Sequence, residues 1–270
     1  MSKTEQRNPK TMNFANESTD RMLRIINEEN MNSVNAVESA IPEIAKAVDA
    51  VAAAFEKGGR LIYVGAGTSA RIAVMDAAEC PPTYGVDYNT VVTVMAGGED
   101  AMFRASENKE DSAEAGREDL MKKNPTSADI VMGISASGNA AYVASAMRAA
   151  KELGCTTVSL SSNYNTKIGD IADIEIVCDT GAEVITGSTR MKAGNAQKFV
   201  LNMISTCAMV KTGKVYENLM INLRPTNIKL RRRMIGIVSD VCEVDFGLAE
   251  QLLEENEFSI RRVFEKYGKV

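Results

Sequence analysis

The chain has 270 residues, of which 45% are hydrophobic and 25% are charged, so it can bury a full core and is neither disordered nor collagen-like. It contains no histidine, which excludes a Ser-His-Asp triad, a histidine metal ligand and a histidine general base. The net charge of -5 offers no basic field to a phosphate backbone, so we expect no nucleic-acid binding.

The N-terminal part of the chain predicts an arm followed by helices. Residues 1–17 are polar and read as a mobile N-terminal arm, and Ser18 is a suitable N-cap for a short helix. Apolar residues then recur at spacings of three and four over residues 34–55, which predicts an amphipathic helix. Pro42 predicts a kink or the start of a second helix, and Gly58 marks the end.

Beyond residue 60, strands and helices alternate. Short apolar runs, typical of buried parallel strands, occupy residues 61–64, 90–94, 130–134, 157–160 and 174–177. Helices are predicted over residues 68–79, 111–122 and 140–153. We expect Cys80-Pro81-Pro82 to stop the first of these helices, and Asp111 with Glu114 to form a capping box at the second. This order of elements predicts an α/β protein with a doubly wound parallel sheet.

The C-terminal part of the chain becomes helical again. One long helix is predicted over residues 188–211, and shorter ones over residues 227–238, 247–254 and 258–267. We therefore expect three parts: the arm of residues 1–17, an α/β domain over residues 18–225 that includes the N-terminal helices, and a short helical region over residues 226–270.

Two loops rich in glycine and hydroxyl groups follow predicted strands. Their candidate binding residues are Gly67, Thr68 and Ser69 in the first loop and Ser135, Ser137 and Gly138 in the second. Backbone N–H groups at a helix start and neighbouring hydroxyls can hold a phosphate, and two such loops at one sheet edge can enclose a small phosphorylated ligand. Two alternatives stay open. The first loop also fits a dinucleotide-binding pattern with Asp87 downstream, and both loops fit simple helix caps.

Two glutamates are candidates for proton transfer, a task that falls to other groups when histidine is absent. Glu79 lies at the expected C-terminus of a helix, where the partial negative charge disfavours the ionised carboxylate, as suits a general acid. Glu110 lies next to a helix N-terminus, which favours the ionised form, as suits a general base. The alternative for each residue is an ordinary solvated glutamate.

Residues 181–192 bring an acid, several hydroxyls and two cations to a helix start. We single out Glu183, Ser188 and Lys192 as candidates for ligand binding. In the alternative interpretation, Glu183 and Lys192 form a structural ion pair while Ser188 or Thr186 caps the helix.

Five stretches carry a resemblance to a known family: RLIYVGAGTSAR, ECPPTYGV, KEDS, ASG and GAEVITGSTRMKAGNAQK. Over residues 18–227 the chain resembles the N-acetylmuramic acid 6-phosphate etherases, which belong to the sugar isomerase (SIS) domain superfamily. The resemblance implies a SIS-type, flavodoxin-like sheet with helical additions at both ends. It also implies cleavage of the D-lactyl ether of N-acetylmuramic acid 6-phosphate into N-acetylglucosamine 6-phosphate and D-lactate during cell-wall recycling, without a metal or cofactor.

In the chemistry of this family, a base removes the C2 proton of the open-chain sugar and an acid helps lactate leave C3. Water then adds to the resulting double bond. By resemblance, Glu110 is the base and Glu79 is the acid.

The resemblance also assigns binding roles and a partner. Ser69, Ser137 and Gly138 match positions that hold the phosphate, and Glu183 with Lys192 matches an interface motif. Family members are homodimers with each site near the subunit boundary, so a homodimer is expected. The chain differs from the usual family residues at Ala70, Ala78, Asn139 and Ala140.

Two other functions stay open from the sequence. One is a non-catalytic sugar-phosphate sensor, like a related regulator of glucokinase, and the other is an aldose–ketose phosphate isomerase, which also abstracts a C2 proton but expels nothing. No apolar run is long enough to span a bilayer, and the chain starts with polar residues rather than a secretory signal. The five cysteines lack C-x-x-C spacing, which is typical of reduced thiols. We therefore expect a cytoplasmic protein with no membrane partner.

Overall fold

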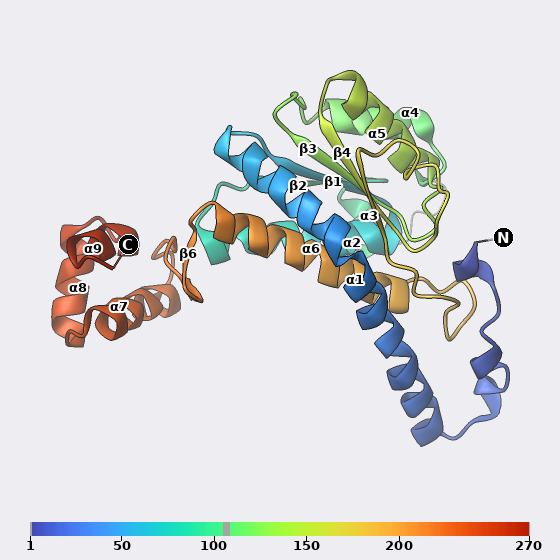
Figure 1. The fold of residues 1–270 in the computed structure, drawn as a ribbon, viewed down its shortest axis with the longest axis horizontal. Coiled ribbons are helices and arrows are strands. Elements are labelled where there is room, and N and C mark those ends of the chain that lie inside the picture. The colour runs from blue at the N-terminus through green and yellow to red at the C-terminus, as the bar shows by residue number, and fades with distance from the viewer. Residues whose placement is uncertain (1, 105–108, 270) are drawn as a thin grey trace.

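A parallel β-sheet forms the centre of the protein, whose computed structural model describes residues 2–104 and 109–269 (Figure 1). The predicted arm and C-terminal region include Met1 and Val270, which lie outside the described residues. Within these residues the sheet contains β1 (Leu61–Gly65), β2 (Val91–Met95), β3 (Ile130–Ile134), β4 (Thr156–Ser161) and β5 (Ile174–Val177). The strands run in the order β2-β1-β3-β4-β5, which is the flavodoxin-like order. The predicted fold class is therefore confirmed.

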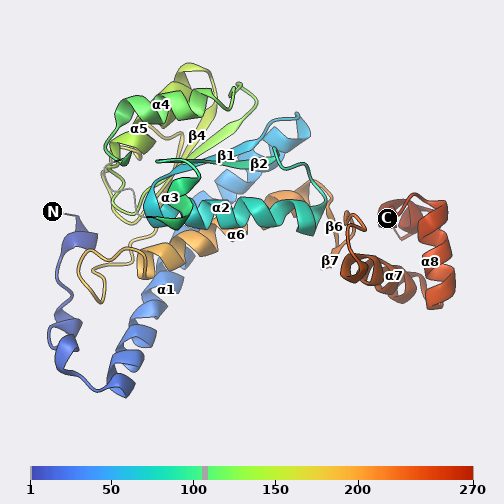
Figure 2. The same cartoon turned by 180° about the vertical axis from the view of Figure 1, so that it is seen from behind.

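Helices cover both faces of the sheet (Figure 2). One face carries α1 (Thr19–Glu56), α2 (Gly67–Tyr84) and α6 (Lys192–Lys211), and the other carries α4 (Ala113–Met121) and α5 (Ala141–Glu152). Side chains alternate along β1, so Leu61 and Tyr63 enter the first core while Ile62 and Val64 enter the second. A short helix, α3 (Asp100–Phe103), follows β2 and was not predicted.

Helix α1 is one continuous helix of 38 residues, so the predicted alternative of a second helix beginning at Pro42 is wrong. The Ser18 hydroxyl caps it as expected by accepting the N–H of Arg21 at 3.3 Å. Pro42 is exposed and removes one helical hydrogen bond, whereas Ile44 and Val51 on the opposite face are buried against the sheet. Burial of that apolar face outweighs the lost bond and keeps the helix continuous.

Helix α2 also continues where the sequence predicts a stop. It passes through Pro81 and Pro82 and ends at Gly85, whose φ of 63° is left-handed. The chain is held there because the Gly85 N–H donates to Pro81 O at 2.8 Å and the Asn222 amide donates to Tyr84 O at 2.5 Å. Glu79 consequently lies inside the helix, more than one turn before its end.

The N-terminal residues pack on the protein. Residues 2–17 contain the 3-10 turns Lys3–Glu5, Pro9–Thr11 and Phe14–Asn16. Thr4, Asn8 and Thr11 are buried, and the segment runs beside the loop between β5 and α6 (Figure 2). The segment predicted as an arm is thus docked along the body in the structure.

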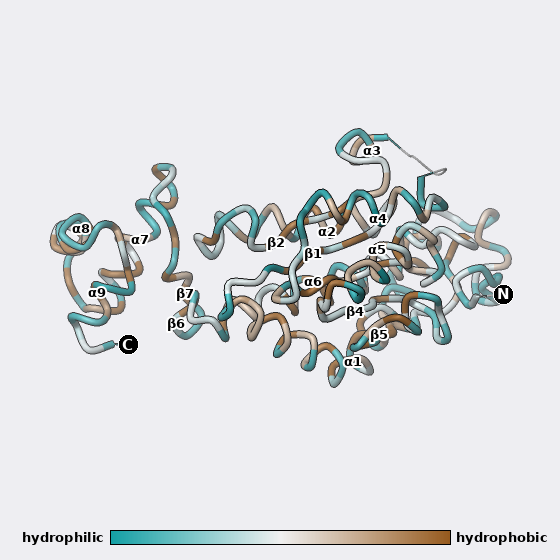
Figure 3. Tube along the Cα trace, turned by 90° about the horizontal axis from the view of Figure 1, so that it is seen from above, coloured by the Kyte–Doolittle hydropathy of each residue, from teal (hydrophilic) through white to brown (hydrophobic). Residues whose placement is uncertain are grey.

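The C-terminal part is a small helical unit with its own core. A hairpin of β6 (Val215–Tyr216) and β7 (Leu219–Met220), which was not predicted, leads into α7 (Ile228–Cys242), α8 (Phe246–Glu255) and α9 (Ile260–Lys266). The three helices lie as a group at one end of the molecule (Figure 3). In the part of the chain that the structure describes, no helix combines the length and apolar character needed to cross a membrane.

Candidate active site

The two hydroxyl-rich loops lie next to each other at the carboxyl edge of the sheet, where the strands end. β1 and β3 pair directly, and their register aligns Gly65 with Ile134, the last residue of each strand. The loop with Gly67 to Ser69 and the loop with Ser135 to Gly138 therefore leave the sheet side by side. This is the neighbourhood that the sequence predicts for a small phosphorylated ligand.

The first loop presents the N-terminus of α2. The helix starts at Gly67, whose φ of 53° is left-handed, and the N-cap position is occupied by Ala66. A methyl side chain cannot accept the first-turn N–H groups, so an anion can satisfy them. Thr68 is half-buried and Ser69 is 8% exposed, which sets their hydroxyls at the start of the helix.

The second loop is shaped by its own serines. The Ser135 hydroxyl accepts the Gly138 N–H at 3.1 Å, and the Ser137 hydroxyl accepts the Asn139 N–H at 3.2 Å. The two hydroxyls are 3.3 Å apart, and because only one of them donates in that pair, the other keeps its proton for a ligand. Gly138 has a φ of 73°, and an added Cβ would lie 2.4 Å from the Thr166 side chain. These bonds close turns within the loop and do not cap α5, whose N-cap is Ala140 without a side-chain bond, so the helix-cap interpretation is wrong for this loop.

Glu183 and Lys192 are both buried, but their partners differ from the predicted ion pair. The Glu183 carboxylate accepts the backbone N–H groups of Lys192 at 3.1 Å and Ala193 at 3.0 Å, so it caps α6. The Lys192 ammonium binds Glu29 of α1 at 2.6 Å and Ala182 O at 2.7 Å. The alternative of a Glu183–Lys192 ion pair is therefore wrong, because the carboxylate faces the helix N-terminus and the ammonium reaches α1.

The start of α6 lies against the first loop. A Cβ added at Gly194 would lie 3.6 Å from both Thr68 and Ile72 of α2. Helix α6 begins at Lys192, so the predicted cap at Ser188 or Thr186 is wrong, and Ser188 is a half-buried loop residue. Burial raises the pKa of the Glu183 carboxyl, and the two backbone donors offset part of that effect.

The two candidate catalytic glutamates lie in different parts of one chain. Glu110 precedes α4, and its carbonyl accepts the N–H of Tyr142 at 3.0 Å, which ties it to the start of α5 beside the second loop. Glu79 is exposed on α2, twelve residues after Gly67, which corresponds to about 18 Å along the helix axis. The structure of a single chain therefore brings Glu110 to the carboxyl edge but leaves Glu79 away from the phosphate loops.

Sequence reasoning missed residues that hold these loops. The Arg71 guanidinium donates to the carbonyls of Ala101 at 2.7 Å and Met102 at 2.9 Å, which fixes the end of α3 on the way to Glu110. Asn163, in the loop after β4, binds the second loop through Ala136 O at 2.9 Å. Arg71 and Asn163 act through contacts with residues distant in sequence, which a local sequence pattern does not report. The sequence pointed to Arg71 only as part of the first-loop motif.

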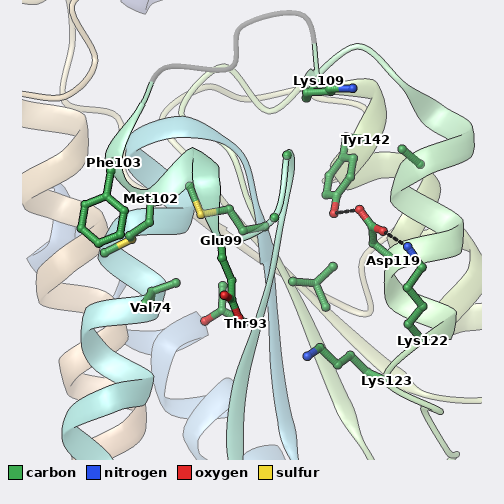
Figure 4. Close-up of a pocket in the computed structure, with 15 residues that line it drawn as sticks. Val74, Thr93, Glu99, Met102, Phe103, Lys109, Asp119, Lys122, Lys123 and Tyr142 are labelled. Carbon is green, nitrogen blue, oxygen red and sulfur yellow. Dashed lines mark hydrogen bonds and ion pairs between the residues drawn. The ribbon is translucent and has the colours of Figure 1, made fainter.

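A cavity of about 710 Å³ lies along the open edge of β2 and is lined by Lys109, the residue before Glu110 (Figure 4). Lys109 and Phe103 are on its lining, and Asp119 inside it accepts hydrogen bonds from Tyr142 at 2.9 Å and Lys122 at 2.7 Å. Burial and the neighbouring Asp119 raise the pKa of the Tyr142 phenol, so it stays protonated. This cavity adjoins the site through Tyr142, whose N–H binds the Glu110 carbonyl.

The sequence is similar to that of known etherases over nearly its whole length. The chain is 51% identical to N-acetylmuramic acid 6-phosphate etherase of Caldanaerobacter subterraneus subsp. tengcongensis, covering 96% of this chain and 84% of the relative, and 48% identical to that of Clostridium beijerinckii, covering 96% and 85%. Residues 43–151 match the family profile described as "Glucokinase regulatory protein N-terminal SIS domain".

Solved structures share the fold at low identity. A phosphoheptose isomerase of Neisseria gonorrhoeae superposes with a TM-score of 0.53 at 19% identity, covering 70% of this chain and 97% of that one. A phosphoheptose isomerase from Francisella tularensis gives 0.52 at 18% identity, covering 74% and 100%. The sheet is thus of the type found in phosphosugar isomerases, and the high identity over nearly the whole sequence decides the family within it. The chain belongs to the N-acetylmuramic acid 6-phosphate etherase family.

Proposed function

We propose that the protein cleaves the D-lactyl ether of N-acetylmuramic acid 6-phosphate, giving N-acetylglucosamine 6-phosphate and D-lactate, as a carbon–oxygen lyase of cell-wall recycling. The observation that carries the proposal is the identity of 46% to 51% with etherases over 96% of the chain. Both candidate proton-transfer residues, Glu79 and Glu110, are present on this scaffold. Reduced thiols at all five cysteines suit the cytoplasm, which we assign as its location.

The substrate phosphate binds between the two loops at the carboxyl edge. The N–H groups of the first turn of α2 and one free hydroxyl proton of the second loop supply donors for its oxygens. The residues assigned to this role are Gly67, Thr68, Ser69, Ser135, Ser137 and Gly138. Because the chain is acidic overall, this local set of donors is what attracts the anion.

Proton transfer is divided between the two glutamates. Glu110 removes the C2 proton of the open-chain sugar as a carboxylate, and Glu79 protonates the lactyl oxygen as it leaves C3. A water molecule then adds at C3, and the proton at C2 is restored. The backbone N–H of Tyr142 donates to the Glu110 carbonyl, while its neutral phenol donates to Asp119.

We further propose that the active form is a homodimer in which Glu79 comes from the second copy of the chain. Glu79 is about 18 Å along α2 from the phosphate loop of its own chain, too far to reach the same sugar. The outer face of the α1–α6 layer carries exposed apolar side chains that a second copy can cover. They are Leu23, Met31, Val34 and Ile41 of α1, with exposures of 43% to 62%, and Phe199, Met203 and Val210 of α6.

Glu183 and Lys192 act as positioning residues under this proposal. Glu183 fixes the N-terminus of α6, and Lys192 joins that end to Glu29 of α1. The half-buried Ser188 lies between them in sequence and remains the substrate-binding candidate of this loop.

The proposed reaction is tested by incubating the protein with N-acetylmuramic acid 6-phosphate and assaying released D-lactate. The wild-type protein and Glu114→Gln, which changes an exposed acid in the first turn of α4, are expected to release lactate at the same rate. Glu110→Gln is expected to lose about 10²–10⁴-fold in rate, the usual contribution of a general base.

The two rival functions predict other outcomes of the same assay. A sensor binds the sugar phosphate without releasing lactate even at high protein concentration. An isomerase forms a ketose and retains the lactyl group. Either result contradicts the proposed function.

A further inference from the structure

The docked N-terminal segment reaches two loops of the candidate site. Thr4 is fully buried, and its carbonyl accepts the N–H of Gly187 at 3.3 Å, in the loop that contains Ser188. Its hydroxyl accepts the Asn163 amide at 3.3 Å, in the loop after β4. One residue of the segment therefore joins loops that are separate in sequence.

Asn163 carries this connection on to the second phosphate loop. Its side-chain oxygen accepts the N–H of Lys3 at 2.8 Å, and its amide donates to Ala136 O at 2.9 Å. Ala136 lies between Ser135 and Ser137, and Asn163 is only 6% exposed. A buried amide with donor and acceptor both used is a strong geometric restraint, since losing either partner leaves a polar group unsatisfied.

Further along, the segment binds the loop before α6 twice more. The Asn8 amide donates to Ala182 O at 3.1 Å and to Glu29 at 2.8 Å, and the Thr11 hydroxyl donates to Val184 O at 2.9 Å. The bonds to Ala182 O and Val184 O lie on either side of Glu183, the residue that caps α6. The segment thus spans from the second phosphate loop to the start of α6.

A polar cavity of about 310 Å³ lies beneath the tip of the segment. It is lined by Ser2, Lys3, Asn139, Asn163, Tyr164 and Asn165. Asn139 directly follows the Ser137-Gly138 pair, so the segment forms one wall of the space beside the phosphate loop.

We propose that residues 2–11 are a positioning element of the phosphate site, and that Thr4 and Asn163 set the affinity for the phosphate group by holding the Ser135–Gly138 loop in place. The inference rests on the proposed function in that the phosphate belongs to the sugar substrate. It assigns a functional role to a segment that the sequence predicts as an arm.

The test compares point variants of the full chain. Asn163→Ala removes the link to the loop, Thr4→Val removes only the hydroxyl, and Thr4→Ser restores it. The matched control is Asn256→Ala, which removes another buried asparagine whose amide donates to Leu252 O at 2.7 Å in the C-terminal unit. Inorganic phosphate binding is measured by calorimetry, KM and kcat by lactate release, and Tm by thermal unfolding.

We expect Asn163→Ala to raise the phosphate Kd and the KM about tenfold, while kcat changes less than about threefold. Thr4→Val should shift both constants in the same direction, and Thr4→Ser should match the wild type. Asn256→Ala should lower Tm and leave Kd and KM unchanged. The inference is overturned if the site variants lower only Tm, or if the wild type binds no phosphate.

Failure of the proposed function gives a different pattern. A wild-type protein that releases no lactate contradicts the etherase reaction, but the effect of Asn163→Ala on phosphate binding still decides the role of the segment.

Discussion

Three charged side chains, Glu29, Glu183 and Lys192, are buried where α1 meets the start of α6. Lys192 and Glu29 are 2% and 5% exposed and form a hydrogen-bonded ion pair at 2.6 Å. Burial alone would raise the pKa of Glu29, but hydrogen bonds from Lys192 and Asn8 outweigh burial and lower it. Removing one partner leaves an uncompensated charge inside the protein. The loss of one partner therefore lowers the free energy of unfolding more than replacement of the whole pair by apolar residues would.

Glu29→Gln should therefore change the pH dependence of stability. Because the folded pKa of Glu29 lies below its ordinary value of 4.5, its stabilising effect is complete above pH 4.5 and is lost as the pH falls through the folded pKa. We expect Glu29→Gln to lower the free energy of unfolding by about 3 kcal/mol at pH 7. This difference from the wild type should become smaller as the pH is lowered. Urea unfolding at a series of pH values measures both.

The control for this prediction is the adjacent Glu28→Gln. Glu28 pairs with Arg21 at 3.4 Å on the exposed surface, so its loss should cost at most about 1 kcal/mol. Equal losses of unfolding free energy for the two variants at pH 7 would contradict the prediction that the buried pair stabilises the protein more than the exposed one.

Residue roles were predictable where the signal is local. Ser18 was predicted as an N-cap because hydroxyl caps act on the next turn of the same chain. The partner of Lys192 was not predictable, since Glu29 is 163 residues away and no local pattern reports that contact. The same holds for Asn163, whose partners come from the N-terminal segment and the loop after β3.

At the scale of elements, strands were predicted better than helix ends. Buried parallel strands are short apolar runs, so β3 and β5 match their predicted ranges over residues 130–134 and 174–177. Helices α1 and α2 instead continue through prolines, because tertiary packing outweighs the lost hydrogen bonds. The end of α2 is fixed by Gly85 and by the bond from the Asn222 amide to Tyr84 O, which the sequence around the prolines does not reveal.

Gly85 offers a test of that contact. An added Cβ would lie 1.8 Å from Asn222 O, whereas in the described part of the chain nothing lies within 4 Å of a Cβ added at Gly58. Both glycines have left-handed φ values, 63° and 77°, so both alanine variants carry the same backbone strain of about 1–2 kcal/mol.

We expect Gly85→Ala to lower the free energy of unfolding by about 2 kcal/mol or more beyond the effect of Gly58→Ala. The reason is that the linker with Asn222 must also move away from the added methyl group. Chemical unfolding of the two variants measures the difference. Similar costs would mean that the end of α2 does not depend on Asn222.

At the scale of the whole molecule, the alternation of strands and helices was enough to predict the doubly wound sheet, which the strand order confirms. The docking of the N-terminal segment depends on contacts between distant parts of the chain. The separation of Glu79 from the phosphate loops follows from the direction of α2, which starts at the carboxyl edge and runs away from it. A complete site therefore requires a second copy of the chain under the proposed function.

Mixing two variants that are each strongly impaired tests the shared site. If Glu79 and Glu110 of one site come from different subunits, dimers of Glu79→Gln with Glu110→Gln contain one intact site. After subunit exchange, half the dimers are mixed, so the mixture should recover about a quarter of wild-type activity. Activity no higher than the average of the two variants alone would mean that each site is built from one chain.

The division of proton transfer between two glutamates is tested most directly by hydrogen exchange at C2 of the substrate in heavy water, followed by mass spectrometry. The account predicts that Glu110→Gln slows both C2 exchange and lactate release by about 10²–10⁴-fold, whereas Glu79→Gln exchanges the C2 hydrogen but releases lactate slowly. Exchange at the wild-type rate in Glu110→Gln would contradict the account, because another group would then be the base.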